Sequence, residues 1–312
     1  MTIAAIFDIC LILLLVSVAV WSVAAREAFS AIIIFMIYGL LLSLAWVRLA
    51  AVDVGLTEAA IGSGVTGMLL LNAQAGLRIA EDAKPVSLPL RIAAGVFCAL
   101  ISAGLAALIL FPSSDPVSLA PAAVANLAES GLGNPVAGVL FVYRSLDTLL
   151  EKVVLLLALL GVWSFAPDRL WGGVPGLRIP ARPNGILVFL AQTLPPIGIL
   201  VGLYMCWVGA NEPGGAFQAG AILAAMWILV MIAGLRKAPS IDLQRMRLML
   251  VAGPAIFLVI GIAGIFLAGS FLAYPAGYAK PLIVVIEVAL TLSIGATLGL
   301  LVCGPPDSVR QP

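Results

Sequence analysis

The chain has 312 residues, of which 63% are hydrophobic and only 10% are charged, and its formal net charge is +1. Soluble globular domains carry about 25% charged residues, so this composition excludes a soluble domain and predicts an integral membrane protein. The 16 basic residues nearly balance the 15 acidic ones, which gives no indication of nucleic-acid binding.

Metal and cofactor chemistry are not indicated by the residue types present. The chain contains no histidine, and its four cysteines are widely separated along the sequence. Histidine is the commonest metal ligand and the usual proton carrier near neutral pH. We therefore expect no metal site and no cofactor, and we expect any proton movement to use carboxylates, lysine and water.

Nine apolar runs follow one another along the chain, each near the length of about 20 residues that spans a bilayer. The first basic residue is Arg26, so the first run lacks the basic start of a cleavable signal and is predicted to stay as a helix. The predicted fold class is all-α, a polytopic integral membrane protein with about nine transmembrane helices. The runs cover residues 3–25, 28–47, 52–73, 90–111, 139–165, 184–208, 216–235, 248–270 and 281–303.

Basic residues alternate between successive connections, which predicts the orientation. The fourth, sixth and eighth connections contain only Lys280 among them, and Arg48 in a short hairpin is the one exception. This pattern predicts an N-terminus outside and a C-terminus inside. The basic residues of the third, fifth and seventh connections are Arg78, Lys84, Arg91, Arg169, Arg178, Arg182, Arg236, Lys237, Arg245 and Arg247.

The connections also suggest how the chain is divided. Residues 166–183 are rich in Pro, Gly and Arg, and are predicted to link a five-helix part, 1–165, to a four-helix part, 184–312. The proline-rich connection before the fifth run is predicted to hold a short interfacial helix within 119–130. No internal repeat is found, which argues against a stand-alone carrier.

The third run opens with two carboxylates. Asp53 suits the N-cap of this helix. Glu58 lies one to two turns deeper, so it must be protonated, paired or hydrated. Two roles therefore remain as alternatives for Glu58: a structural hydrogen bond to a neighbouring helix, or a place on a proton path. Residues 62–67 fit G-x-G-x-x-G, but inside a membrane span this pattern predicts close packing or a π-bulge rather than nucleotide binding.

The fifth run carries charged side chains at its centre, where each one costs roughly 2.5–3.5 kcal/mol. Arg144 and Asp147 have the i,i+3 spacing of an ion pair, whereas Asp147 and Glu151 would repel each other if both were charged. Such a polar seam is either a hydrated proton path or a static ion-pair network that holds a partner helix. At about 100° per residue, one arc of roughly 140° holds Arg144, Asp147, Thr148, Glu151 and Lys152.

Two later features add to these. Pro213-Gly214, in the loop 209–218, predicts a tight turn between the sixth and seventh runs. Glu287 lies about two turns into the ninth run, with Thr291 at i+4, and is therefore predicted to be inside the membrane rather than at its surface.

Three segments together resemble the Mrp-type multisubunit Na⁺/H⁺ antiporters. Asp53-Val54-Gly55-Leu56-Thr57-Glu58-Ala59-Ala60 is similar to the D-x-A-L-T-E-A motif near the C-terminus of the large A subunit. Tyr143-Arg144-Ser145-Leu146-Asp147-Thr148-Leu149-Leu150-Glu151 resembles the D-F-R-x-x-D-T-x-G-E motif of that subunit. Pro213-Gly214-Gly215-Ala216-Phe217-Gln218 resembles the P-G-G-G-F-x-G-G signature of the B subunit. The chain thus resembles the C-terminal (DUF4040-like) region of the A subunit fused to a B-type (MnhB-like) subunit.

The chain also departs from these motifs. Val142 replaces an aspartate, Leu150 replaces a glycine, and Ala210 stands where the B-type signature often has histidine. The antiporter-like part of the A subunit, with its lysine-bearing broken helices, has no counterpart. The resemblance therefore implies an accessory subunit rather than a complete antiporter.

The implied protein is not an enzyme, and it contributes to an ion or proton path and to complex assembly. Its expected partners are other membrane subunits, the lipid bilayer, and Na⁺ and H⁺ as transported ions, in the inner (plasma) membrane of the cell. An equivalent subunit in the membrane arm of an energy-converting hydrogenase or related respiratory complex is an alternative, as is a purely structural subunit.

The predicted site follows from the positions of the charged residues and from the resemblance. The predicted proton or ion path consists of Glu58, Arg144, Asp147, Glu151, Lys152 and Glu287. The predicted motif and structural residues are Asp53, Thr57, Thr148, Pro213, Gly214, Gly215 and Phe217.

Overall fold

A computed structural model describes residues 2–76, 87–111, 117–176 and 185–308. Four of the basic residues used for the orientation, Arg78, Lys84, Arg178 and Arg182, lie outside these ranges, as does the end of the predicted linker. The first half contains α1 (Ile3–Ala24), α2 (Ala28–Arg48), α3 (Val52–Thr57), the π-helix η1 (Glu58–Val65), α4 (Thr66–Gly76), α5 (Leu88–Leu110), α6 (Ala120–Ala125), the 3₁₀ helix η2 (Leu127–Ser130), α7 (Pro135–Gly138) and the π-helix η3 (Val139–Tyr143).

The second half is also helical, apart from one short strand pair. It contains α8 (Ser145–Trp163), the 3₁₀ helix η4 (Asp168–Leu170), β1 (Val174–Pro175), α9 (Gly185–Val208), α10 (Ala216–Ile232), α11 (Gln244–Ala268), α12 (Ala279–Cys303) and β2 (Pro306–Ser308). β1 and β2 pair antiparallel and join the segment after α8 to the segment after α12. The predicted all-α membrane fold is confirmed.

Among the described residues, seven helices have the length and the apolar composition needed to cross a membrane. They are Ile3–Ala24, Ala28–Arg48, Val52–Ala75, Leu88–Leu110, Gly185–Val208, Gln244–Ala268 and Ala279–Cys303. The other two predicted runs also form helices. The apolar helix Ala216–Ile232 has only 17 residues, and α8 carries Asp147, Glu151 and Lys152. The count of nine spans and the orientation therefore stay predictions.

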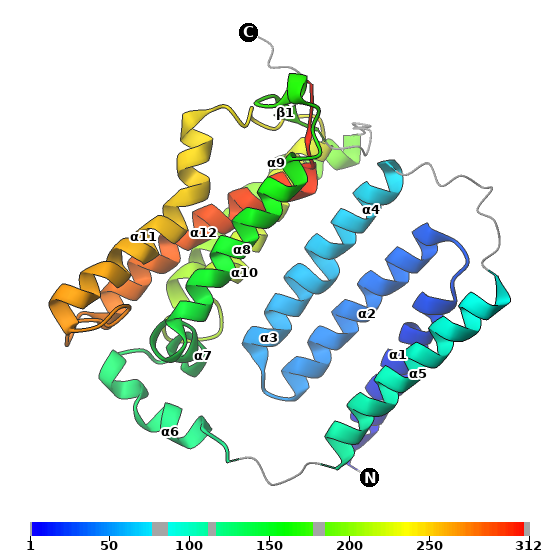
Figure 1. The fold of residues 1–312 in the computed structure, drawn as a ribbon, viewed down its shortest axis with the longest axis horizontal. Helices are drawn as coiled ribbons and strands as arrows, with labels where there is room; N and C mark the ends of the chain where they lie inside the picture. The colour runs from blue at the N-terminus through cyan, green and yellow to red at the C-terminus, as the bar shows by residue number, and fades with distance from the viewer. Residues whose placement is uncertain (1, 77–86, 112–116, 177–184, 309–312) are drawn as a thin grey trace.

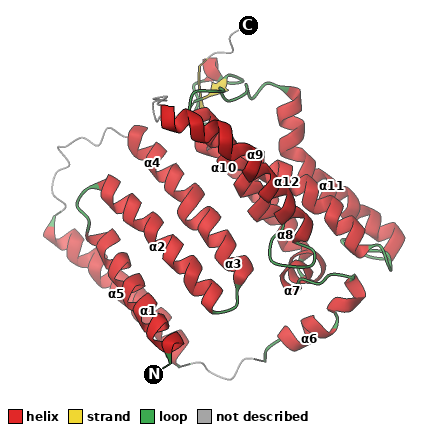
Figure 2. Cartoon of the chain, turned by 180° about the vertical axis from the view of Figure 1, so that it is seen from behind, coloured by secondary structure: helices red, strands yellow, loops and turns green. Residues whose placement is uncertain are grey.

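The helices form two neighbouring groups. Figure 1 shows α1, α2 and the continuous α3–η1–α4 helix as one layer beside the bundle of α8 to α12, and Figure 2 shows the same arrangement from behind. α12 is the centre of the bundle, because it packs against α8, α9, α10 and α11. The two groups meet where α10 contacts α3 and η1, and where α12 contacts α4. The predicted boundary at 166–183 stays a prediction, although α8 packs on the helices that follow it.

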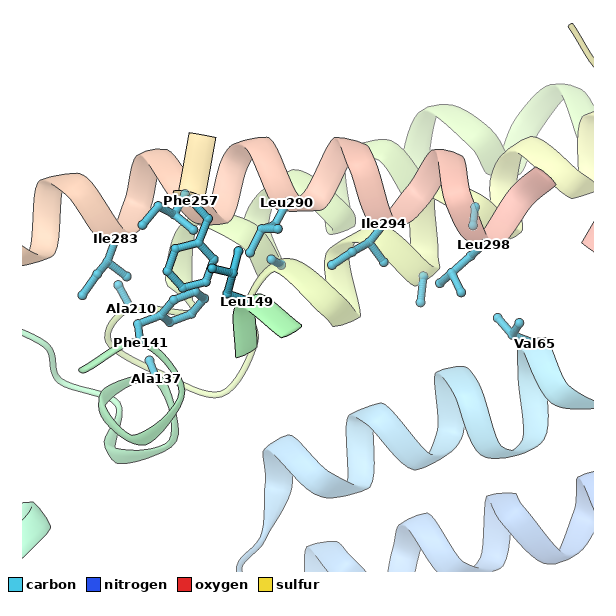
Figure 3. Packing of buried hydrophobic residues seen from close by; sticks show 14 of the residues in the cluster. Val65, Ala137, Phe141, Leu149, Ala210, Phe257, Ile283, Leu290, Ile294 and Leu298 are labelled. Carbon is cyan, nitrogen blue, oxygen red and sulfur yellow. The ribbon is translucent and has the colours of Figure 1, made fainter. Parts of the chain in front are cut away.

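The core lies mainly in the bundle and extends to η1 and the start of α4 in the first layer. Phe141 and Phe257 pack with ring centroids 5.9 Å apart, and Leu290 continues the same buried row along α12 (Figure 3). Val65, on η1, is the buried side chain that extends this cluster to the first group. Of the two alternatives for the G-x-G-x-x-G segment, close packing or a π-bulge, the structure contains a π-helix, η1, that overlaps its first four residues.

α5 differs from every other spanning helix. All of its residues are exposed, so within the described ranges it buries none of its apolar surface against the rest of the chain. The segment 119–130 does form the short helices that the prolines predict, α6 and η2.

Candidate functional site: a polar cavity at the junction of the two helix groups

The helix that carries the charged residues is interrupted just before them. Asn134 begins α7 as its N-cap, since the Val136 N–H donates to Asn134 Oδ1 at 2.9 Å, and Pro135 occupies the first helical position. η3 then ends at Arg144, whose φ of −130° and ψ of 36° leave the helical region. α8 restarts at Ser145, and the Thr148 hydroxyl donates to Leu140 O at 2.6 Å across the break.

The members of the predicted polar seam differ in how far they are exposed. Arg144 Nη2 pairs with Asp147 Oδ2 at 2.6 Å, as the spacing predicts, but the two side chains are 70% and 56% exposed. Thr148 and Lys152 are buried, whereas the Glu151 side chain is 49% exposed. Asp147, Thr148, Glu151 and Lys152 all lie on the uninterrupted α8, so the break displaces only Arg144 from the predicted arc. One edge of the arc is buried within the chain and the other is exposed.

Lys152 points into the protein and has two partners there. Its Nζ donates to Glu151 Oε1 at 2.7 Å and lies 4.4 Å from the centre of the Phe217 ring. A buried ammonium needs an anion and other polarisable contacts to offset its lost hydration. Phe217 belongs to the predicted loop motif, so this contact joins α8 to the start of α10.

Glu287, on α12, is the most deeply buried of the described acidic residues, with 1% of its surface exposed. The backbone N–H of Ala216, the first residue of α10, donates to its carboxylate. A Cβ at either Gly209 or Gly215 would lie 3.1 Å from Glu287 Oε1, so the glycines leave room for the carboxylate. Oε2 has no hydrogen-bond partner within the described part of the chain.

A cavity of about 230 Å³, here called the central cavity, connects these groups. A single water needs only about 10–15 Å³ of such space, so several waters fit. The polar side chains in its lining include Thr57, Glu151, Lys152, Gln218 and Glu287. No group of three or more His, Cys, Asp or Glu able to hold a metal occurs in the described ranges.

The remaining predicted path residues lie elsewhere. Arg144 and Asp147 do not line the central cavity, and neither does Glu58. Glu58 begins η1 and folds its carboxylate over Gly62 of the same helix, in a space that any side chain at position 62 would occupy. The structure thus brings Glu151, Lys152 and Glu287 together and separates them from Glu58.

Asp53 joins the two helix groups through a set of contacts here called the Asp53 clamp. Its side chain is nearly buried, at 8% exposure, and accepts from the Gly214 N–H at 2.9 Å and from Asn134 Nδ2 at 3.4 Å. Asn134 Nδ2 also reaches Gly209 O at 3.1 Å and Glu212 O at 3.0 Å. Gly215 has a φ of +115°, which favours glycine at this turn.

The clamp overturns the N-cap interpretation of Asp53. α3 begins at Val52 with Ala51 as its N-cap and no side-chain cap, so Asp53 lies inside the first turn. Its Oδ1 atom instead accepts a hydrogen bond from the backbone N–H of Gly214, in a loop 161 residues further along the chain. A second contact of the same kind runs from Gln218 Nε2 to Thr57 Oγ1 at 3.1 Å.

Sequence reasoning missed two polar residues of this junction. Asn134 had a usable signal, since an asparagine directly before a proline is typical of a helix start. Gln218 was part of the motif Pro213–Gln218 but was not selected as a site residue. Its partner, Thr57, was predicted as a motif residue, and in the structure Thr57 Oγ1 accepts a hydrogen bond from Gln218.

Family models match two separate parts of the chain. Residues 186–305 match the domain related to the MnhB subunit of Na⁺/H⁺ antiporters. Residues 13–78 match MbhD, a subunit of MBH. An uncharacterized protein from Methanocaldococcus jannaschii is 29% identical over 154 residues, which covers 45% of this chain and 59% of that protein.

Two solved structures are similar in fold. The Mrp complex from Dietzia sp. DQ12-45-1b has a chain that matches with a TM-score of 0.75 and 25% identity, covering 97% of this chain and 35% of that chain. The archaeal membrane-bound sulfane sulfur reductase (MBS) matches with a TM-score of 0.55 and 23% identity, over 69% of this chain and 97% of that one. The chain spans about three fifths of its curated relative and about a third of the Mrp chain.

The Pro213–Gln218 motif lies within the MnhB-related region, and the Asp53–Glu58 motif lies within the MbhD-like region. The structural similarity to the Mrp complex extends over nearly the whole chain. The chain is therefore a multi-pass membrane protein whose fold is similar to part of a chain of the Mrp complex, and in which an MbhD-like segment precedes an MnhB-related domain.

Proposed function

We propose that the chain is an accessory membrane subunit of a multisubunit monovalent cation/proton (Na⁺/H⁺) antiporter, contributing to the ion or proton path and to complex assembly. The observation that carries this proposal is the central cavity, which gathers Lys152, Glu151 and Glu287 from two helices of the bundle. The MnhB-related domain and the similarity to the Mrp complex support the antiporter context. In this context the chain is a transporter component rather than an enzyme, and its partners are other membrane subunits.

Within the central cavity we assign different roles to the three ionisable groups. Lys152 is held by Glu151 and by the Phe217 ring, so its ammonium provides a positive charge at one wall. Glu287 presents a carboxylate oxygen without a partner among the described residues, which makes it the group able to take a proton or a hydrated cation from the cavity. Water in the cavity would connect the two walls.

The exposed pair of Arg144 and Asp147 is proposed to face another protein of the complex. Charged side chains that are 70% and 56% exposed on a spanning helix are costly against lipid. A polar partner surface or a hydrated entrance removes that cost. Glu58 is retained as a predicted path residue on the first helix group, outside the central cavity.

The membrane topology belongs to the same proposal. Nine spans, an outside N-terminus and an inside C-terminus follow from the apolar runs and the basic residues. The division into parts 1–165 and 184–312 and a place in the inner (plasma) membrane complete it. Lipid and the transported Na⁺ and H⁺ are the remaining expected partners.

An alternative function is supported by the match to MbhD. In that case the chain would be the equivalent membrane-arm subunit of an energy-converting hydrogenase or a related respiratory complex. The fold similarity to MBS is compatible with the same alternative. The two functions differ in what drives ion movement, a cation gradient or electron transfer.

The test measures ion movement in everted vesicles that contain the native complex. Addition of Na⁺ or K⁺ should release protons from acidified vesicles, and Glu287→Gln and Glu151→Gln should each lower the rate about tenfold or more. Glu129→Gln, an exposed acid on η2, is the matched control and should leave the rate unchanged. Co-purification of the partner subunits checks that each variant complex assembles.

Three results would contradict the proposal in different ways. Unchanged antiport in both variants, with normal assembly, would show that the central cavity is not on the path. Proton movement that needs an electron donor and ignores the cation would favour the respiratory alternative. Transport by the chain alone in liposomes would rule out an accessory role.

A further inference from the structure

The backbone turn 214–216, at the start of α10, contacts two buried carboxylates from different helix groups. The Gly214 N–H donates to Asp53 Oδ1 at 2.9 Å, and the Ala216 N–H donates to the Glu287 carboxylate. The two acids, on α3 and α12, are 8% and 1% exposed. A single residue, Gly215, therefore separates the N–H that binds a side chain of the first helix group from the N–H that binds the acid of the central cavity.

Few groups hold this turn in place. Its middle N–H, from Gly215, donates to Met205 O on α9 at 2.9 Å, so each of the three successive N–H groups has one acceptor. Gly214 and Gly215 have φ values of +154° and +115°, a backbone conformation that residues with a Cβ rarely adopt. Asp53 is thus one of the two acceptors outside the central cavity that the described residues supply to the N–H groups of the turn.

α3 also holds the first turn of α10 through a side chain. Gln218 Nε2 donates to Thr57 Oγ1 at 3.1 Å and lies 3.4 Å from Asp53 O. The unpaired N–H groups at a helix N-terminus carry a partial positive charge, so an ionised carboxylate is stabilised there over a short range. The position of α3 against this helix start therefore affects how closely the Ala216 N–H approaches Glu287.

We propose that Asp53 is a positioning residue for proton exchange at Glu287. It holds the turn 214–216 so that the Ala216 N–H stays on the Glu287 carboxylate, and a hydrogen bond to the ionised form favours that form. The inference rests on the proposed function, in which Glu287 takes protons from the central cavity. When the turn is released, Glu287 loses this donor and retains its proton to a higher pH.

Other titratable groups lie near Glu287 and are unchanged when Asp53 is replaced. Neither α10 nor α11 adds a charged side chain to the cavity lining. The charge of Asp53 itself acts in the opposite direction to the hydrogen bond, because a nearby negative charge favours the protonated acid. The neighbouring groups are Lys152 and Glu151 of α8, which line the cavity, Cys206 of α9, which accepts from Thr291 at 3.2 Å, and Lys280, about two turns earlier on α12 and bonded to Asn211 Oδ1 at 2.7 Å.

The experiment measures the pH dependence of Na⁺-driven proton movement in everted vesicles that contain the native complex. We expect Asp53→Ala to move the pH of half-maximal rate upward by about 0.5–1 unit, the equivalent of one partly lost hydrogen bond. Asp53→Asn keeps an oxygen for the Gly214 N–H and should stay at the wild-type value or slightly below it. Asn72→Ala removes another hydrogen bond between the helix groups, from Asn72 Nδ2 to Val302 O at 2.8 Å, and should leave the pH profile unchanged.

A second readout does not depend on transport. The infrared carbonyl band of Glu287, identified as the band that Glu287→Gln lacks, is titrated in the purified chain, and Asp53→Ala should shift its midpoint upward as well. If the alanine complex does not assemble, Asp53→Ser, whose shorter side chain reaches Gly214 less well, should shift the midpoint in the same direction. A shifted infrared midpoint without any effect of Glu287→Gln on antiport would support the positioning role and contradict the proposed function.

Three results would overturn the positioning role. An assembled Asp53→Ala or Asp53→Ser variant with the wild-type infrared midpoint would show that Asp53 does not act on Glu287. A shift in Asp53→Asn equal to that in Asp53→Ala, in either direction, would show that the hydrogen bond to Gly214 is not the cause. An equal shift in Asn72→Ala would mean that the pH dependence only follows the loosening of the junction.

Discussion

Replacement of Asp53 by alanine should loosen the junction between the two helix groups. The side chain is 8% exposed and accepts one strong hydrogen bond, from the Gly214 N–H at 2.9 Å, and a longer one, from Asn134 Nδ2 at 3.4 Å. A hydrogen bond to a charged group contributes about 1.5–3 kcal/mol, so Asp53→Ala should cost about 2–4 kcal/mol. At about 2 °C per kcal/mol for a chain of this size, the melting temperature should fall by about 4–8 °C.

The assay follows intrinsic tryptophan fluorescence of the purified chain during heating. Asp53→Asn should lower the melting temperature less, because its amide oxygen can still accept a hydrogen bond from the Gly214 N–H. Asp168→Ala, an exposed acid on η4, is the control and should shift the transition by less than about 1 °C. A double-mutant cycle with Asn134→Ala measures the coupling across the junction.

Two results would refute parts of the reasoning about the clamp. A melting temperature of Asp53→Ala within about 1 °C of the wild type would mean that the clamp adds no stability. Simple addition of the effects of Asp53→Ala and Asn134→Ala would instead refute the contact between these two side chains, because groups in one hydrogen-bond network should be coupled.

Two further predictions concern the loop before α10. Gly209→Ala should prevent correct folding, seen as aggregation on size-exclusion chromatography, because its Cβ would collide with the backbone of Gly215, whereas Gly95→Ala, with nothing within 4 Å, should elute normally. Phe217→Leu should remove the ring that Lys152 contacts at 4.4 Å and lower stability by about 0.5–2 kcal/mol. Phe217→Tyr should keep the wild-type melting temperature, and an equal loss in both variants would contradict a cation–π contribution.

The fold could be predicted from the sequence because it depends on local physics. Apolar runs of bilayer length become helices wherever backbone groups cannot reach water, and all nine predicted runs are helical. The cluster of small residues at 62–67 predicts close packing or a π-bulge, and the π-helix η1 overlaps it. What the runs could not predict was packing, since α5 is as apolar as its neighbours and yet buries nothing in the described chain.

The candidate site was predicted only in part, and the reason is the range of the interactions. Arg144 and Asp147 pair at i,i+3, as the spacing predicts, because Arg144 is the N-cap of the turn that contains Asp147. The sequence could not show that the helix breaks at Arg144, or which side of α8 packs against the bundle, where Lys152 is buried while Glu151 stays half exposed.

Hydropathy and spacing therefore determined that this is a polytopic membrane protein with charged residues that cannot face lipid. Only the tertiary structure decided which of them meet. Asp53 and Gly214 are 161 residues apart, and Glu287 reaches the start of α10 through space left by two glycines. Such contacts depend on the relative placement of helices, which the periodicity of one helix does not determine.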